Sequence, residues 1–211
     1  MKITHDDNML DTNALAANKP AANDINLPNP VRTNLRTGLL EPDPRVERST
    51  KTVAQMADVF ADEQARQQMA PHTLMYAVEY WRPVIDGTEG GLFWGNSTIF
   101  PGVVGDEYFM TRGHFHARPD RAEYYITVSG AGVLVLMDEQ RRGSVQLMEP
   151  GTTHYIPGRI AHRVVNTGDT PLTFLACWPS DAGHDYATIE KRGFSLRVVR
   201  RNGRPEVLEQ A

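Results

Sequence analysis

The spacing of hydrophobic and polar positions changes along this 211-residue chain. In the first 30 residues Asn, Asp, Ala and Pro dominate and no apolar face repeats, so we expect an irregular extension over residues 1–48. After Ser49, apolar residues recur at helical spacing, which predicts a peripheral helix over 52–69 that ends before Pro71. The residues of this apolar face are Val53, Met56, Val59 and Phe60.

From Leu74 to about Trp178 the pattern becomes one of short runs rich in Val, Ile, Tyr, Phe and Thr. Turn signals such as Pro150-Gly151 separate the runs, and no helical pattern lies between them, which is typical of an antiparallel sandwich or barrel. Beyond it we expect a short helix near 186–192 and a final hairpin over 194–208. The pattern therefore predicts one all-β domain over residues 49–211.

Composition excludes several function classes. The chain has 22 Lys and Arg against 26 Asp and Glu, a net charge of −4, whereas gripping nucleic acid or an anionic membrane favours a basic face. No apolar run approaches the roughly 20 residues that span a bilayer. One cysteine, Cys177, allows no intramolecular disulfide, and Asp6 and Asp7 stand where a signal peptide needs an apolar core. We therefore expect a cytoplasmic protein with neither nucleic acid nor membrane as partner.

Histidines gather in the later part of the β region. On a strand, residues two apart share a face, so His114 and His116 can reach one metal ion from one side. Glu123 opens the next expected strand, and His162 on a later strand can supply a fourth ligand. The alternative is that the His-x-His pair lies on an exposed edge strand. His154 is more simply explained as a barrel or interface histidine than as a ligand.

Two longer strings surround these residues. In the first, six residues separate Glu123 from Gly130; in the second, Gly151 is followed by Pro157, His162 and Asn166. These strings resemble the two motifs of the cupin superfamily, which implies a jelly-roll β-barrel in which His-x-His, Glu and the later His bind one metal. The sequence departs from that pattern at Arg159, where a Gly is usual, and in its longer gap between His116 and Glu123.

A narrower resemblance rests on the string from Gly113 to Glu123 and on Asp181-Ala-Gly-His-Asp-Tyr186. These strings look like the signature of the cupin-type phosphoglucose isomerases, and the similarity extends over roughly residues 50–200. It implies interconversion of glucose 6-phosphate and fructose 6-phosphate, a place in glycolysis and gluconeogenesis, and a homodimer. Trp178 stands where some members of the family carry a Tyr.

The resemblance also implies a role for each matching residue. Fe²⁺ is the favoured metal, with Mn²⁺, Ni²⁺ or Zn²⁺ as alternatives, held by His114, His116, Glu123 and His162. Three groups would be catalytic: Glu123 as the base, Tyr125 at the reacting carbons and His184 at ring opening. The phosphate would lie among Ser97, Thr111 and Gly113.

Two other functions remain open at this point. A cupin Fe(II) dioxygenase can use the same ligand set, but it has no use for a phosphate pocket. A non-enzymatic cupin that binds a sugar phosphate would recognise the same ligand without converting it. Within the isomerase interpretation, proton transfer by Glu123 and a hydride shift between C1 and C2 both remain possible, because a metal-bound carboxylate is a weakened base.

Overall fold

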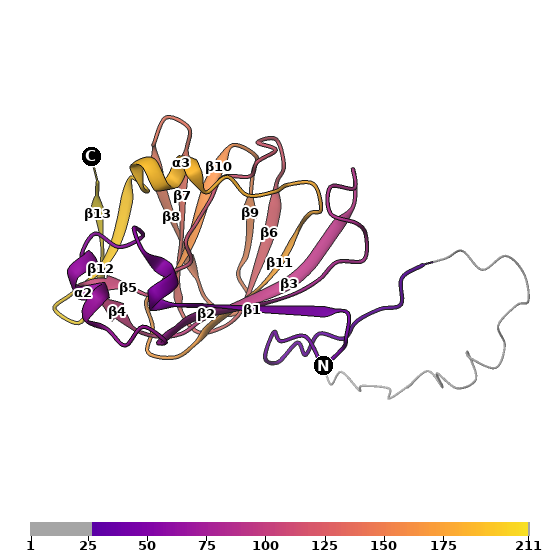
Figure 1. Cartoon of the computed structure of the whole chain (residues 1–211), viewed down its shortest axis with the longest axis horizontal. Helices are drawn as coiled ribbons and strands as arrows, with labels where there is room; N and C mark the ends of the chain where they lie inside the picture. Colours follow the sequence, from indigo (N-terminus) through magenta and orange to yellow (C-terminus); the bar gives the residue numbers. More distant parts are fainter. Residues whose placement is uncertain (1–26, 211) are drawn as a thin grey trace, which may run out of the picture.

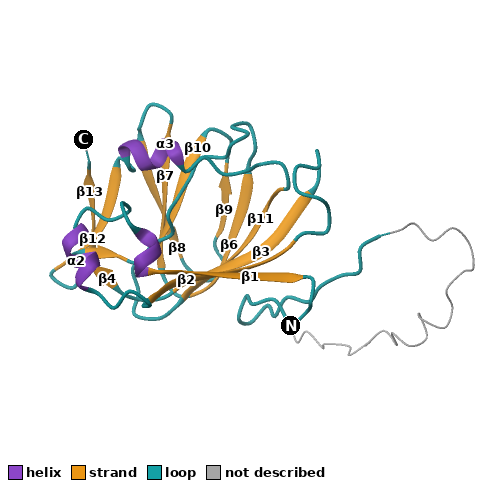
Figure 2. Ribbon diagram, in the orientation of Figure 1, coloured by secondary structure: helices purple, strands orange, loops and turns teal. Residues whose placement is uncertain are grey.

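The computed structural model describes residues 27–210, and most of these lie in antiparallel sheets (Figures 1 and 2). Residues 1–26 of the expected extension lie outside the described residues. The elements are β1 (Val46–Thr52), η1 (Val53–Met56), α2 (Glu63–Gln68), β2 (Leu74–Trp81), β3 (Leu92–Ile99), β4 (Val103–Val104), β5 (Glu107–Tyr108), β6 (Glu123–Ser129), β7 (Gly132–Asp138), β8 (Gly143–Met148), β9 (Thr153–Ile156), β10 (Ile160–Asn166), β11 (Leu172–Pro179), α3 (Ala187–Arg192), β12 (Leu196–Arg201) and β13 (Arg204–Glu209).

Three sheets are present in this part of the chain. The largest has the strand order β1-β2-β3-β11-β6-β9, a second has the order β10-β7-β8, and a third has the order β13-β12-β5-β4. Their inward apolar side chains belong to one buried cluster, which includes Ile99, Leu134 and Val198. The three sheets therefore share one core, and the expected all-β barrel is confirmed.

Strand β6 shows how the sequence sets the two faces of the largest sheet. Glu123, Tyr125 and Thr127 are buried, while Tyr124 between them is 51% exposed. This alternation follows the two-residue period of a strand. Because Glu123 and Tyr125 share the inner face, the carboxylate and the phenol both point into the barrel.

The helix expected over 52–69 is wrong in its extent. Thr50 and its neighbours belong to strand β1, η1 spans only Val53–Met56, and α2 begins at Glu63. Val53, Met56 and Phe60 are buried as the helical spacing required, but Asp58 adopts φ +62° and interrupts the helix. A compact turn therefore buries the same apolar residues without a continuous helix.

The C-terminal expectations are confirmed. Helix α3 lies at Ala187–Arg192, and β12 and β13 form the final hairpin. Asn202 (φ +51°) and Gly203 (φ +73°) form its two-residue turn, the pairing of positive φ angles that matches strand twist. None of the helices within residues 27–210 has the length and apolar character needed to cross a membrane.

Residues just before β1 pack on the largest sheet. Leu40 is buried, its N–H donates to Glu79 Oε2 at 2.8 Å, and the Trp94 indole N–H donates to Thr33 Oγ1 at 3.0 Å. Strand β1 begins at Val46, so the sheet includes residues on both sides of position 48. The division of the chain into an extension and a domain stays a prediction.

Candidate metal centre

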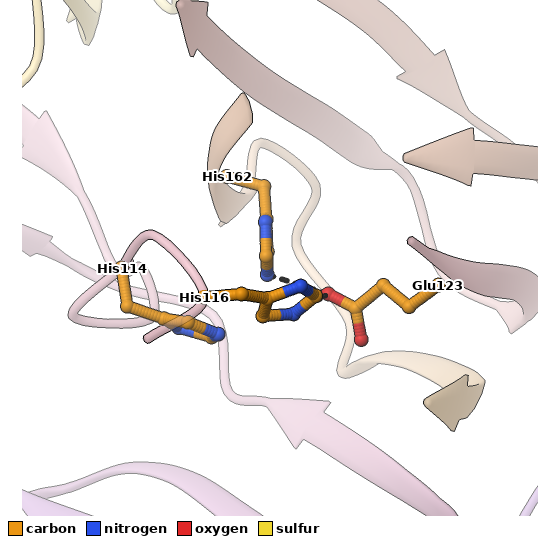
Figure 3. A group of neighbouring side chains, drawn as sticks. All are labelled: His114, His116, Glu123 and His162. Atoms are coloured by element: carbon orange, nitrogen blue, oxygen red, sulfur yellow. Dashed lines mark ion pairs between the residues drawn. The ribbon is translucent and has the colours of Figure 1, made fainter. Parts of the chain in front are cut away.

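Four side chains converge inside the barrel (Figure 3). The ligand atoms of His114, His116, Glu123 and His162 all lie within 4.8 Å of one another. His114 and His116 come from the segment between β5 and β6, Glu123 opens β6, and His162 lies on β10. The structure thus brings together the whole ligand set that the resemblance implies.

The segment carrying the two histidines is not the regular strand that their spacing suggested. It is held by isolated bridges: the N–H of His114 donates to the His162 carbonyl at 3.3 Å, and the N–H of His162 donates to the His114 carbonyl at 3.1 Å. Gly113 precedes them with φ +75°, and a Cβ at that position would lie 2.6 Å from the Phe194 ring. A glycine is therefore required where the backbone turns toward β10.

Backbone contacts orient two of the imidazoles. His116 Nδ1 lies 2.8 Å from the Arg121 carbonyl oxygen, and His162 Nδ1 lies 3.2 Å from the Ile160 carbonyl oxygen. A ring N–H at Nδ1 that donates to a carbonyl leaves Nε2 unprotonated and free to act as a ligand. Both Nε2 atoms face Glu123.

Unsatisfied polar atoms show that these residues fit a metal ion. Glu123 Oε1 and His162 Nε2 lie 2.6 Å apart, yet both are buried and neither has a hydrogen-bond partner within the described chain. Such buried atoms are rare in folded proteins, because each costs free energy. A cation bound by three imidazole nitrogens and one carboxylate would satisfy both, and this donor set suits Fe²⁺, Mn²⁺, Ni²⁺ or Zn²⁺.

For Glu123 and His114, the protonation states that metal binding needs are already favoured. Burial acts to raise the pKa of Glu123, but the neighbouring His162 and His116 outweigh it and hold that pKa below its usual range. Burial also lowers the pKa of His114 well below its ordinary value, and the nearby His162 and His184 act in the same direction. An ionised carboxylate and a neutral imidazole are the forms that coordinate cations.

The cluster forms part of the wall of a cavity of about 400 Å³. The other residues proposed as catalytic or phosphate-binding also line this cavity: Ser97, Thr111, Gly113, Tyr125 and His184. Burial, together with the charge of Glu123, raises the pKa of Tyr125 well above its ordinary value. His184 stacks on Tyr186 with ring centroids 5.4 Å apart, and its own centroid lies 4.4 Å from that of His114.

One histidine lies away from the cluster as expected, and two residues at the cavity were not anticipated. His154 lies apart from the cluster, with its ring nitrogens near Thr152 Oγ1 and Gln146 Oε1. Trp178 lines the cavity and packs edge-on against Phe93. Lys51 and Tyr76 line it as well, although neither was proposed. Recognising residues 46–52 as a strand would have found Lys51, which shares the inner face of β1 with Ser49.

Arg159, where the sequence departs from the cupin motif, lies in the turn before β10. This residue adopts φ +64°, which explains why a glycine is usual there, and its N–H reaches the Pro119 carbonyl. Its side chain forms only an exposed ion pair with Glu139 at 3.2 Å. We expect Arg159→Gly to be more stable than Arg159→Ala by about 1 kcal/mol, because both lose the ion pair and only the glycine relieves the backbone. Urea unfolding of both variants measures the difference, and equal stabilities would contradict it.

Comparison with known proteins identifies the family to which the chain belongs. The family model of glucose-6-phosphate isomerase (GPI) matches residues 50–210. A glucose-6-phosphate isomerase of Thermococcus litoralis is 39% identical over 174 residues, which is 82% of this chain and 90% of that protein. One from Pyrococcus furiosus is 38% identical, with 85% of this chain and 93% of that protein covered.

Among solved structures, an oxalate decarboxylase from Bacillus subtilis is similar with a TM-score of 0.40 and 23% identity, over 52% of this chain and 26% of that one. The family match and the relatives extend over most of the chain, including every residue of the four-ligand cluster. The chain therefore belongs to the glucose-6-phosphate isomerase family, in its all-β cupin form.

Proposed function

We propose that this protein is a metal-dependent aldose–ketose isomerase that interconverts glucose 6-phosphate and fructose 6-phosphate. The observation that carries the proposal is the convergence of four ligand atoms, two of them buried and unsatisfied, on the wall of a cavity of about 400 Å³. Membership of the isomerase family supplies the reaction class.

The reaction moves one hydrogen from C2 of the open-chain aldose to C1 and one proton from O2 to O1. A divalent ion, when bound, supplies Lewis-acid stabilisation of the two neighbouring oxygens. The residues of the chain must then position the sugar, open its ring and hold the moving protons. These tasks divide among groups that face the cavity from different strands.

Glu123 is the proposed base for the hydrogen on C2, because it is ionised and lies at the cavity wall. Tyr125, two residues further along the same face of β6, remains a neutral phenol and can donate a hydrogen bond to a substrate oxygen. Burial lowers the pKa of His184, so its imidazole is neutral and can exchange protons with the ring oxygen and O1. A hydride shift would need the same positioning and would leave Glu123 as a ligand only.

Chelation tests this function. Protein stripped with EDTA should lose conversion of fructose 6-phosphate, and one divalent metal returned at one equivalent per chain should restore it. Conversion is measured by coupling glucose 6-phosphate formation to NADP reduction. Single additions of Fe²⁺, Mn²⁺, Ni²⁺ and Zn²⁺ identify the effective ion, with Fe²⁺ expected to be the best.

Two results would contradict the proposal. One is full activity in protein shown by elemental analysis to be free of metal. The other is no conversion with any metal at fructose 6-phosphate concentrations that calorimetry shows to saturate the site, which would favour a sugar-phosphate-binding protein instead. The homodimer implied by the family resemblance stays a prediction, and sedimentation of the purified protein tests it.

A further inference from the structure

Arg163 is a buried cation that has no role in the chemistry described so far. It follows His162 on β10, is 7% exposed and does not line the cavity. Its guanidinium carbon lies 4.4 Å from the centre of the Phe194 ring. A guanidinium keeps its proton at neutral pH, so this buried group is charged. Burying a cation is costly unless it is paired.

The partner of Arg163 is a peptide group instead of a carboxylate. Its Nε and Nη2 both donate to the Arg112 carbonyl oxygen, at 3.1 Å and 2.5 Å. The carboxylate whose charge acts on it, Glu107, is itself ion-paired with Arg197 at 3.0 Å. The positive charge is therefore directed at one end of the peptide that joins Arg112 to Gly113.

The other end of that peptide faces the cavity. In a trans peptide the C=O and N–H groups point in opposite directions, and the described chain contains no cis bond. With the Arg112 carbonyl directed at Arg163, the N–H of Gly113 points the opposite way, and Gly113 lines the cavity. This N–H has no acceptor among residues 27–210.

A second donor lies beside this N–H. The Thr111 hydroxyl oxygen accepts the Val164 N–H at 3.1 Å, which leaves its own proton free to be donated. Thr111 also lines the cavity. A free backbone N–H, a free hydroxyl and a cation behind the peptide together form an environment for an anion.

We propose that Arg163 is a positioning residue that aims and polarises the Gly113 N–H toward the phosphate of the substrate. The inference rests on the proposed function for the identity of the anion, but the contacts of Arg163 do not depend on it. Arg163 acts through the peptide bond and does not touch the substrate. The fixed charge both holds the carbonyl end and strengthens the donor at the N–H end.

Replacing Arg163 by Met, which fills similar space without charge, tests this proposal. We expect the KM for fructose 6-phosphate to rise about tenfold or more while kcat stays within about twofold, as for the loss of one hydrogen bond to a charged group. Competitive inhibition by inorganic phosphate should weaken by the same factor, whereas inhibition by unphosphorylated sorbitol should not change. Arg163→Lys should recover part of the loss, because an ammonium can still donate to the carbonyl.

Arg141 offers a matched control, since it also donates to backbone carbonyls, those of Arg192 and Gly193, but lies away from the cavity of about 400 Å³. Arg141→Met should keep wild-type kinetics. A parallel fall in kcat, phosphate inhibition and sorbitol inhibition in Arg163→Met would show a merely structural role and overturn the proposal. So would unchanged phosphate inhibition. If Arg163→Met does not fold, the same kinetic and inhibition measurements on Arg163→Lys test the proposal.

A measurement without turnover separates this inference from the proposed function. In Zn²⁺-loaded protein labelled with ¹⁵N-glycine, inorganic phosphate should shift the Gly113 amide resonance, and Arg163→Met should reduce that shift. An inactive protein that still shows this shift would refute the isomerase and keep the role of Arg163. An active enzyme whose Gly113 resonance does not shift with phosphate would support the isomerase and refute the role of Arg163.

Discussion

His162→Ala should release the metal and remove isomerase activity together. His162 Nε2 is buried, has no other partner in the described chain, and lies 2.6 Å from Glu123 Oε1. Because even the partners behind a ligand contribute 10–100-fold to metal affinity, loss of a ligand itself should cost at least about a hundredfold. Elemental analysis after gel filtration measures the bound metal, and the coupled assay measures the rate.

The control is His154→Ala, which removes another buried histidine from a strand of the same barrel. His154 lies apart from the ligand cluster, so this variant should keep its metal even if its melting temperature falls. Thermal unfolding of both variants separates loss of metal from loss of fold. Wild-type metal content and rate in folded His162→Ala would show that the ligand assignment is wrong.

Glu123→Gln should lower kcat/KM by at least about a hundredfold. The amide keeps the size of the side chain but removes the negative charge that binds the cation and the basic oxygen proposed to take the hydrogen from C2, a role worth 10²–10⁴-fold. Metal content should fall as well, since a neutral amide is a weaker ligand for these ions. Saturating the assay with metal separates the two losses, because added ion restores occupancy but supplies no base.

Tyr124→Phe is the matched control, since Tyr124 is the next residue of β6 but points outward and is 51% exposed. This variant should keep wild-type kinetics. The kcat/KM of Glu123→Asp should lie between those of the wild type and Glu123→Gln, because the shorter side chain keeps the negative charge but holds it further from the cluster. Restoration of full activity to Glu123→Gln by excess metal alone would exclude Glu123 as the base and favour a hydride shift.

Three of the four ligands could be predicted because their signals are local. His114, His116 and Glu123 lie within one short string, and the alternation along β6 places Glu123 and Tyr125 on the inner face. His162 is remote in sequence, but the resemblance to the cupin motif supplies it. The structure brings these side chains together even though the segment around His114 is held by isolated bridges and is not a regular strand.

Other features depend on long-range contacts that no local pattern reveals. The spacing of Val53, Met56 and Phe60 matched a helix, but a turn with Asp58 at φ +62° buries the same side chains. Lys51 reaches the cavity only because β1 pairs with β2, opposite Tyr76. The environment of Arg163 depends on the direction of one carbonyl group, which the sequence does not specify.

The place of β11 in the largest sheet has a consequence for synthesis on the ribosome. This strand, Leu172–Pro179, lies between β3 and β6 and pairs with both, whereas all four proposed ligands precede it in the chain. A nascent chain that has emerged only as far as residue 166 carries every ligand but lacks the strand that joins the two halves of the sheet. The sheet that carries Glu123 can therefore be completed only after β11 has emerged, although every proposed ligand has already left the ribosome.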